Sequence, residues 1–189
     1  MFLKNFFIEI KWYLIKKKLK AITLIILDVD GVLTDGFLYY GIEGTQIKKF
    51  SVKDGLGIRY LQKAGFKICI VSGGNEEVIK KRAKDLDIKN VYCLVKNKKE
   101  KVRYLRNKLN TSKQNTLYVG DDLNDLAAKS EVGLFISTQD ATKALKKHSH
   151  AILRSKGGEN AIRELAERIL AKSKMMVDIE KNGFIEVNK

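Results

Sequence analysis

The chain has 189 residues, of which 44% are hydrophobic, and its 37 Lys and Arg against 22 Asp and Glu give a formal charge of +15. This length and composition are typical of one globular domain with terminal extensions, and they exclude a chain too short for a full core. Nucleic acid, an anionic membrane or an anionic substrate could each explain the charge. The lysines are scattered, without interleaved aromatic residues, so no nucleic-acid partner is expected.

The first twenty residues, MFLKNFFIEIKWYLIKKKLK, form an N-terminal extension for which we predict a helix. Glu9 and Lys11 interrupt its apolar run and no small-residue cleavage site follows, so neither a signal peptide nor a stably inserted helix is expected. An amphipathic surface helix fits better, either at a subunit contact or loosely at a membrane. The two cysteines, Cys69 and Cys93, lie in apolar segments and predict buried thiols in a reducing cytoplasm.

Short apolar segments alternate with longer amphipathic ones from residue 21 to residue 172, which we take as the main domain. Such alternation predicts an α/β fold: a three-layer, Rossmann-like parallel sheet with helices on both faces. The predicted strands are residues 22–27, 67–71, 90–94, 116–119, 132–136 and 151–153, and the predicted helices are residues 55–64, 76–86, 99–109, 123–130, 141–147 and 160–172.

Two segments depart from this rhythm. Between Asp35 and Asp54 the stretch GFLYYGIEGTQIKKFSVK alternates apolar and polar residues around GIEG, which predicts a β-hairpin inserted after the first strand. Residues 173–189 are polar and basic and are expected to form a C-terminal tail or arm.

Polar clusters follow four of the predicted strands. Asp28 and Asp30 come after the first, VSGG at 71–74 after the second, the lysines of VKNKKEK after the third and VGDDLND at 119–125 after the fourth. The carboxyl ends of parallel strands meet at one edge, where ligands bind in open α/β sheets. A structural role for Asp28 and Asp30 alone is disfavoured, because unpaired buried carboxylates are costly.

Phosphoryl transfer is the chemistry that uses such a set. A carboxylate attacks an anionic phosphate only if positive charge screens the repulsion, which a divalent cation with oxygen ligands and a lysine supply. One aspartate can act as nucleophile and a second as general acid and base. Residues two apart in extended backbone project to the same side, so Asp28 and Asp30 can address one substrate.

The motifs DVDGVLTDG, VSGG, the lysine after the third strand and GDDLND resemble the four signatures of haloacid dehalogenase superfamily phosphatases. Together with FSVKDGLGIRYLQKAG, KKRAKDLDI and GGENAIREL they resemble the 3-deoxy-D-manno-octulosonate 8-phosphate phosphatase family, over roughly residues 20 to 170. The resemblance implies a Mg²⁺-dependent phosphomonoesterase that lacks a large cap domain, assembles as a homotetramer, forms an aspartyl-phosphate and serves lipopolysaccharide biosynthesis.

The same resemblance implies site residues. Asp28 would be the nucleophile and a metal ligand, and Asp30 the acid and base, with its backbone carbonyl on the metal. Asp121 would be the remaining metal ligand, and Asp125 would support it or the lysine. Ser72, with the adjacent amides including Gly73, would hold the phosphoryl oxygens.

The phosphate-binding lysine is expected to be Lys98 by register, with Lys99 and Lys101 as alternatives. Asp122 is expected to support the site or to cap the following helix.

Two positions depart from the family pattern: Gly74 replaces an arginine, and Asn160 replaces a glycine near the end of the domain. They leave the substrate open between the eight-carbon sugar acid phosphate and a nine-carbon, sialic-type one. A catalytically silent assembly module of the same fold is a further alternative, disfavoured by the intact Asp28, Asp30 and Asp121. A phosphatase for nucleic-acid ends has only the charge in its favour.

Overall fold

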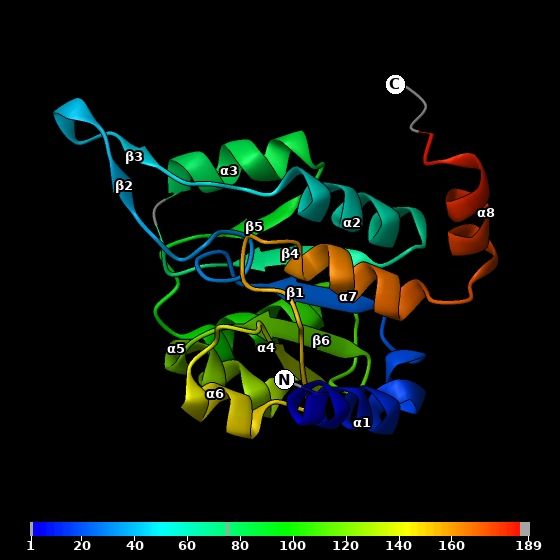
Figure 1. The fold of residues 1–189 in the computed structure, drawn as a ribbon. Helices are drawn as coiled ribbons and strands as arrows, with labels where there is room; N and C mark the ends of the chain where they lie inside the picture. The colour runs from blue at the N-terminus through cyan, green and yellow to red at the C-terminus, as the bar shows by residue number, and fades with distance from the viewer. Residues whose placement is uncertain (1, 75, 186–189) are drawn as a thin grey trace.

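The computed structural model describes residues 2–74 and 76–185, and the side chains of residues 6–74 and 77–185. Its centre is a six-stranded parallel sheet in the order β5-β4-β1-β6-β7-β8 (Figure 1). The strands are β1 (Leu24–Leu27), β4 (Lys67–Val71), β5 (Asn90–Tyr92), β6 (Thr116–Gly120), β7 (Leu134–Ser137) and β8 (Ala151–Ile152). The predicted α/β fold and all six predicted strands are confirmed, with ends that differ by at most two residues.

Helices cover both faces of the sheet. On one face lie α2 (Val52–Lys63), α3 (Glu76–Asp85) and α7 (Ala161–Leu170), and on the other α4 (Lys98–Lys108), α5 (Leu123–Leu126) and α6 (Lys143–His148) (Figure 1). The continuous helix expected over residues 123–130 is instead α5 followed by a 3₁₀ segment, η2 (Ala127–Glu131). The three-layer arrangement is therefore as predicted.

The β1 strand shows why its sequence is apolar throughout. Its side chains alternate between the faces: Ile25 and Leu27 join the core under α2 and α7, and Leu24 and Ile26 join the core under α4 and η2. All four are fully buried, because β1 is a central strand covered on both sides. The two residues that leave this strand, Asp28 and Asp30, therefore start from a rigid support.

The segment after β1 forms the predicted hairpin. Strands β2 (Tyr39–Tyr40) and β3 (Gln46–Ile47) pair antiparallel around a short 3₁₀ turn, η1 (Ile42–Gly44). The hairpin projects beyond the sheet at the upper left of Figure 1. In the described residues no larger insertion separates β1 from α2.

Both termini add a helix. Helix α1 (Phe2–Leu19) buries Ile8, Trp12 and Ile15 in the core, and the Trp12 indole donates a 2.8 Å hydrogen bond to the Ile152 carbonyl of β8. The segment expected as a C-terminal tail contains helix α8 (Lys174–Asn182), and its last residues, 186–189, lie outside the described part. The apolar face of α8, with Met176 and Ile179 buried, is too short to stand out in the sequence.

Two further observations concern the environment of the protein. Among the described helices, none combines the length and the apolar character that crossing a bilayer requires. Neither cysteine forms a disulfide; Cys69 is buried as predicted, and Cys93 is only partly buried.

Candidate active site

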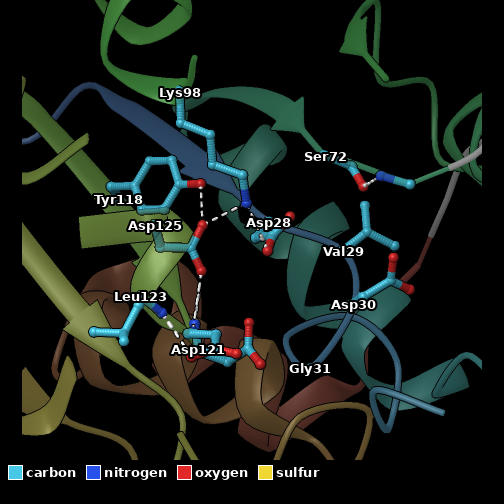
Figure 2. Close-up of polar contacts among 12 residues, drawn as sticks. Asp28, Val29, Asp30, Gly31, Ser72, Lys98, Tyr118, Asp121, Leu123 and Asp125 are labelled. Atoms are coloured by element: carbon cyan, nitrogen blue, oxygen red, sulfur yellow. Dashed lines mark hydrogen bonds and ion pairs between the residues drawn. The ribbon is translucent and has the colours of Figure 1, made fainter. Parts of the chain in front are cut away.

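Asp28 lies where the chain leaves β1, and its carboxylate is almost fully enclosed. The residue is 3% exposed, its backbone N–H donates to the Val119 carbonyl of β6, and its Oδ2 lies 2.8 Å from the Lys98 ammonium (Figure 2). Its other oxygen, Oδ1, is buried without a hydrogen-bond partner among the described residues. Burial, then the nearby Asp125 carboxylate, raise the pKa of Asp28 to about 7.

A second buried carboxylate, Asp125, holds Lys98 in place. Its Oδ1 accepts hydrogen bonds from Lys98 Nζ at 2.5 Å and from the Tyr118 hydroxyl at 2.7 Å. Its Oδ2 accepts from the backbone N–H groups of Asp121 and Asp122. With both oxygens occupied, Asp125 is a structural anchor that aims the ammonium at Asp28, as Figure 2 shows.

Asp121 completes the acidic cluster from the end of β6. Carboxylate oxygens of Asp28, Asp121 and Asp125 lie within 4.8 Å of one another. Burial, then the charges of Asp125 and Asp28, raise the pKa of Asp121 to about 8. Gly31 makes this approach possible: a Cβ there would lie 2.1 Å from Asp121 Oδ2, and its φ of +75° suits glycine.

The loop after β4 brings Ser72 to the same edge. Ser72 is 1% exposed, and its hydroxyl accepts a 3.0 Å hydrogen bond from the Gly74 N–H. A cavity of about 440 Å³ is lined by residues of all these loops: Asp28, Asp30, Gly36, Ser72, Gly73, Gly74, Asp121, Asp122 and Asn124. The polar clusters therefore meet at one edge of the sheet, as predicted. Asp28 and Asp30 line the same cavity there.

The three candidate lysines have different surroundings. Lys98 is the first residue of α4 and is 2% exposed between Asp28 and Asp125, outside the set of residues that line the cavity. Lys99 is exposed. Lys101 lies over the Tyr92 and Tyr104 rings. Of these lysines, only Lys98 is bonded to Asp28.

Asp122 directly precedes α5 and caps its N-terminus. Its side chain accepts a 2.7 Å hydrogen bond from the Leu123 N–H, and it shares a reciprocal capping box with Asp125. The capping alternative thus describes its contacts, although Asp122 also borders the cavity.

Two residues of this site were missed in the sequence. Lys48, just after β3, forms an ion pair with Asp30 Oδ1, and its side chain is 2% exposed. Nothing in QIKKF distinguishes Lys48 from its neighbour, because the contact depends on how the hairpin returns to the sheet. Tyr118 could have been recognised from the sequence, because a tyrosine in a buried strand needs a hydrogen-bond partner for its hydroxyl.

The two departures from the family pattern have structural explanations. A Cβ on Gly74 would lie 2.7 Å from Asp30 Oδ2 and 3.3 Å from Lys48 Nζ, so glycine leaves room for this ion pair. Asn160 has φ +75° and ψ +23°, the left-handed conformation that asparagine tolerates better than most residues. The loop before it packs on the loop after β1, where Gly158 N–H donates to the Val32 carbonyl.

Comparison with known proteins agrees with this geometry. Residues 51–133 match the haloacid dehalogenase-like hydrolases. The 3-deoxy-D-manno-octulosonate 8-phosphate phosphatase KdsC of Haemophilus influenzae is 37% identical over 173 residues, which cover 90% of this chain and 96% of that protein. The chain belongs to this phosphatase family. It is accordingly a phosphoric monoester hydrolase.

Solved structures of relatives share the fold. The Moraxella catarrhalis phosphatase, in complex with magnesium, phosphate and KDO, superposes with a TM-score of 0.84 at 36% identity, covering 88% of this chain and 97% of that one. The cobalt-bound Haemophilus influenzae enzyme gives 0.83 at 36% identity, with 89% and 99% covered. The relatives are thus matched over almost their whole length.

The acidic cluster of this phosphatase fits a divalent cation. The Asp28 Oδ1 oxygen is buried without a hydrogen-bond partner among the described residues, and burial, then the neighbouring carboxylates, raise the pKa values of Asp28 and Asp121. Oxygen ligands of this kind suit hard cations such as Mg²⁺. Asp125 is the least available of the three, because hydrogen bonds already engage both of its oxygens.

Without a divalent cation, the free energy of unfolding is expected to fall as the pH rises from about 5 to about 8. The pKa values of about 7 for Asp28 and about 8 for Asp121 lie above the ordinary 3.8, so the folded state binds more protons than the unfolded state in this range. Raising the pH therefore removes stability. Urea unfolding in EDTA at several pH values measures the slope, and stability that rises with pH would contradict the assignment.

Proposed function

We propose that the protein is a Mg²⁺-dependent phosphatase that hydrolyses 3-deoxy-D-manno-octulosonate 8-phosphate to the free sugar acid and phosphate. The observation that carries the proposal is the Asp28 carboxylate, buried against Lys98 and bordering one cavity with Asp30 and Ser72. The relatives named for this activity match 79–90% of the chain at 36–37% identity. The substrate of these relatives is the best guide to the substrate of this protein.

In the first half-reaction a carboxylate oxygen of Asp28 attacks phosphorus, and the bond from phosphorus to the sugar oxygen breaks. Asp30, whose side chain is 35% exposed at the cavity, gives its proton to the departing alkoxide. The product is an aspartyl-phosphate on Asp28 and the free sugar acid.

In the second half-reaction Asp30 takes a proton from water, which attacks the same phosphorus atom. The acyl-phosphate bond breaks, inorganic phosphate leaves and the Asp28 carboxylate is restored. Ser72 and the Gly73 and Gly74 amides are suited to hold the phosphoryl oxygens, since they border the cavity. Lys98 acts through Asp28, keeping it ionised and directed at the cavity.

The metal would be held by the carboxylates of Asp28 and Asp121 and by the backbone carbonyl of Asp30. When bound, Mg²⁺ supplies positive charge that offsets the repulsion between a carboxylate and a phosphate. Asp125 supports this set through Lys98 and the Asp121 N–H, without being counted as a ligand.

A second cavity, of about 520 Å³, provides space for the sugar acid. It lies between the hairpin and α3, and it is lined by Glu43, Gly44, Thr45, Gln46, Lys48, Glu77, Val78 and Lys81. Lys48 joins it to the reaction site, because its ammonium contacts Asp30. Lys81 also lines this cavity and can pair with a substrate carboxylate, whereas Lys48 is paired with Asp30.

The proposal extends to the oligomeric state of the protein and to its cellular role. The hairpin exposes Tyr39, Tyr40, Ile42 and Ile47, an apolar surface suited to pairing with other copies in a homotetramer. A cytoplasmic location and a role in lipopolysaccharide biosynthesis follow from the proposed substrate.

A panel of phosphorylated sugar acids tests the substrate. We expect the specificity constant for the eight-carbon phosphate to exceed that for a nine-carbon, sialic-type phosphate by about tenfold or more. Phosphate release should stop in EDTA and return with Mg²⁺. A higher specificity constant for the nine-carbon ester would contradict the proposed substrate while leaving the chemistry intact.

Replacing Lys48 tests its link to Asp30. We expect Lys48→Met to lower kcat by about tenfold to a hundredfold, because Asp30 loses the partner that orients it. The loss should be similar for the sugar acid phosphate and for glycerol 3-phosphate, which has no carboxylate, and Lys48→Arg should restore most activity. A loss confined to KM for the sugar acid would instead make Lys48 a carboxylate-binding residue.

A further inference from the structure

The outward face of helix α1 is apolar. Phe6, Phe7, Ile10, Tyr13 and Leu14 are 58%, 63%, 39%, 76% and 71% exposed, and their spacing places them on one side of the helix. We call these five residues the α1 stripe. The opposite side, with Ile8, Trp12 and Ile15, is buried in the core, so α1 is apolar on two sides.

Lysines border the α1 stripe. The last turn of α1 carries Lys16, Lys17 and Lys18, all exposed. By helical spacing Lys17 continues the stripe, four residues after Tyr13, while Lys16 and Lys18 flank it on either side. The single acidic residue of the helix, Glu9, is paired with Arg154 and Arg168.

We propose that the α1 stripe binds the surface of an anionic lipid bilayer, with α1 lying in the plane of the membrane. Aromatic and leucine side chains on one face, bordered by lysines, are the composition of helices that lie in the bilayer interface. The three lysines in the last turn of α1, within a protein of charge +15, favour anionic headgroups.

The fold presents this stripe rigidly and away from the catalytic edge. The Trp12 hydrogen bond to Ile152 and the Glu9 ion pairs fix α1 against β8 and α7. In Figure 1 α1 lies at the lower right, whereas the hairpin projects at the upper left. Attachment through α1 therefore leaves the cavity between the strand ends open, and the proposal does not depend on which substrate that cavity takes.

Flotation of the full-length protein with lipid vesicles tests this. We expect binding to vesicles of phosphatidylcholine with phosphatidylglycerol, weak binding to phosphatidylcholine alone, and loss of binding at high salt. A variant with Phe7→Ser, Tyr13→Ser and Leu14→Ser should bind at least about tenfold less. Lys16→Glu with Lys17→Glu should do the same, whereas Lys84→Glu with Lys89→Glu, an identical change in charge at exposed positions on and just after α3, on the opposite side of the sheet in Figure 1, should not.

Phosphatase activity and circular dichroism establish that each variant is folded, since none of these residues borders the cavity. The proposal is overturned if the wild type does not float with anionic vesicles. It is also overturned if the serine variant floats as well as the wild type. If that variant floats normally and light scattering shows a lower molar mass than for the wild type, the stripe is instead a contact between copies of the chain.

Discussion

Asp28→Asn is expected to reduce phosphate release at least about a thousandfold while the protein stays folded. The amide has the shape of the carboxylate but is not a nucleophile towards phosphorus. Lys98 keeps its second partner, Asp125 Oδ1 at 2.5 Å, so the substitution does not leave the ammonium unpaired. The loss should appear in kcat for every phosphate ester tested.

The stability of this variant provides a second readout. Asp28 contributes to the excess of buried negative charge, so Asp28→Asn should unfold in EDTA with a shallower dependence on pH than the wild type. Asp178→Asn on α8, an exposed position, is the matched control and should change neither property. Turnover close to that of the wild type would remove Asp28 from the role of nucleophile.

Lys98→Met is expected to lower both activity and stability. Removing one partner from a buried ion pair costs about 3–5 kcal/mol, since the charges that remain are unpaired. Without the ammonium, Asp28 and Asp125 face each other with nothing between them, and the pKa of Asp28 should rise further above about 7. Activity should fall at least about a hundredfold, because the nucleophile is protonated at neutral pH.

The neighbouring lysines provide matched controls for this experiment. Lys99→Met and Lys101→Met remove the same charge from the same helix, but neither side chain contacts Asp28 or Asp125. Both variants should keep nearly full activity and should unfold at nearly the wild-type urea concentration. Loss of activity in Lys99→Met with an active Lys98→Met would reverse the assignment.

The sequence was sufficient for the parts of the fold that depend on local patterns. Buried strands such as β1 are continuous apolar runs, and the hairpin alternates apolar and polar residues around glycines, so both could be located. Parallel strands bring their carboxyl ends together, and for this reason Asp28, Ser72 and Asp121 could be assigned to one edge from their places in the sequence. Strand order and the split of one helix into α5 and η2 depend on packing between distant segments.

The features that the sequence did not reveal depend on contacts between residues that are far apart in the chain. Lys48 reaches Asp30 only because the hairpin folds back over the loop after β4, and Gly74 leaves the necessary space. Lys98, by contrast, was preferred from its register, and it is the lysine of the first turn of α4 that contacts Asp28. Helix α8 was missed because Met176 and Ile179 form too short an apolar pattern to stand out.

The most direct measurement asks whether phosphate passes through a bond to the protein. The wild-type enzyme is mixed with excess sugar acid phosphate and Mg²⁺, quenched in acid, reduced with borohydride and digested for mass spectrometry. An acyl phosphate at position 28 would be reduced to homoserine in the peptide from residues 21–48, only when substrate was present. An unmodified Asp28 under conditions of full turnover, or the modification on another aspartate, would mean that this carboxylate is not the group that accepts the phosphoryl group.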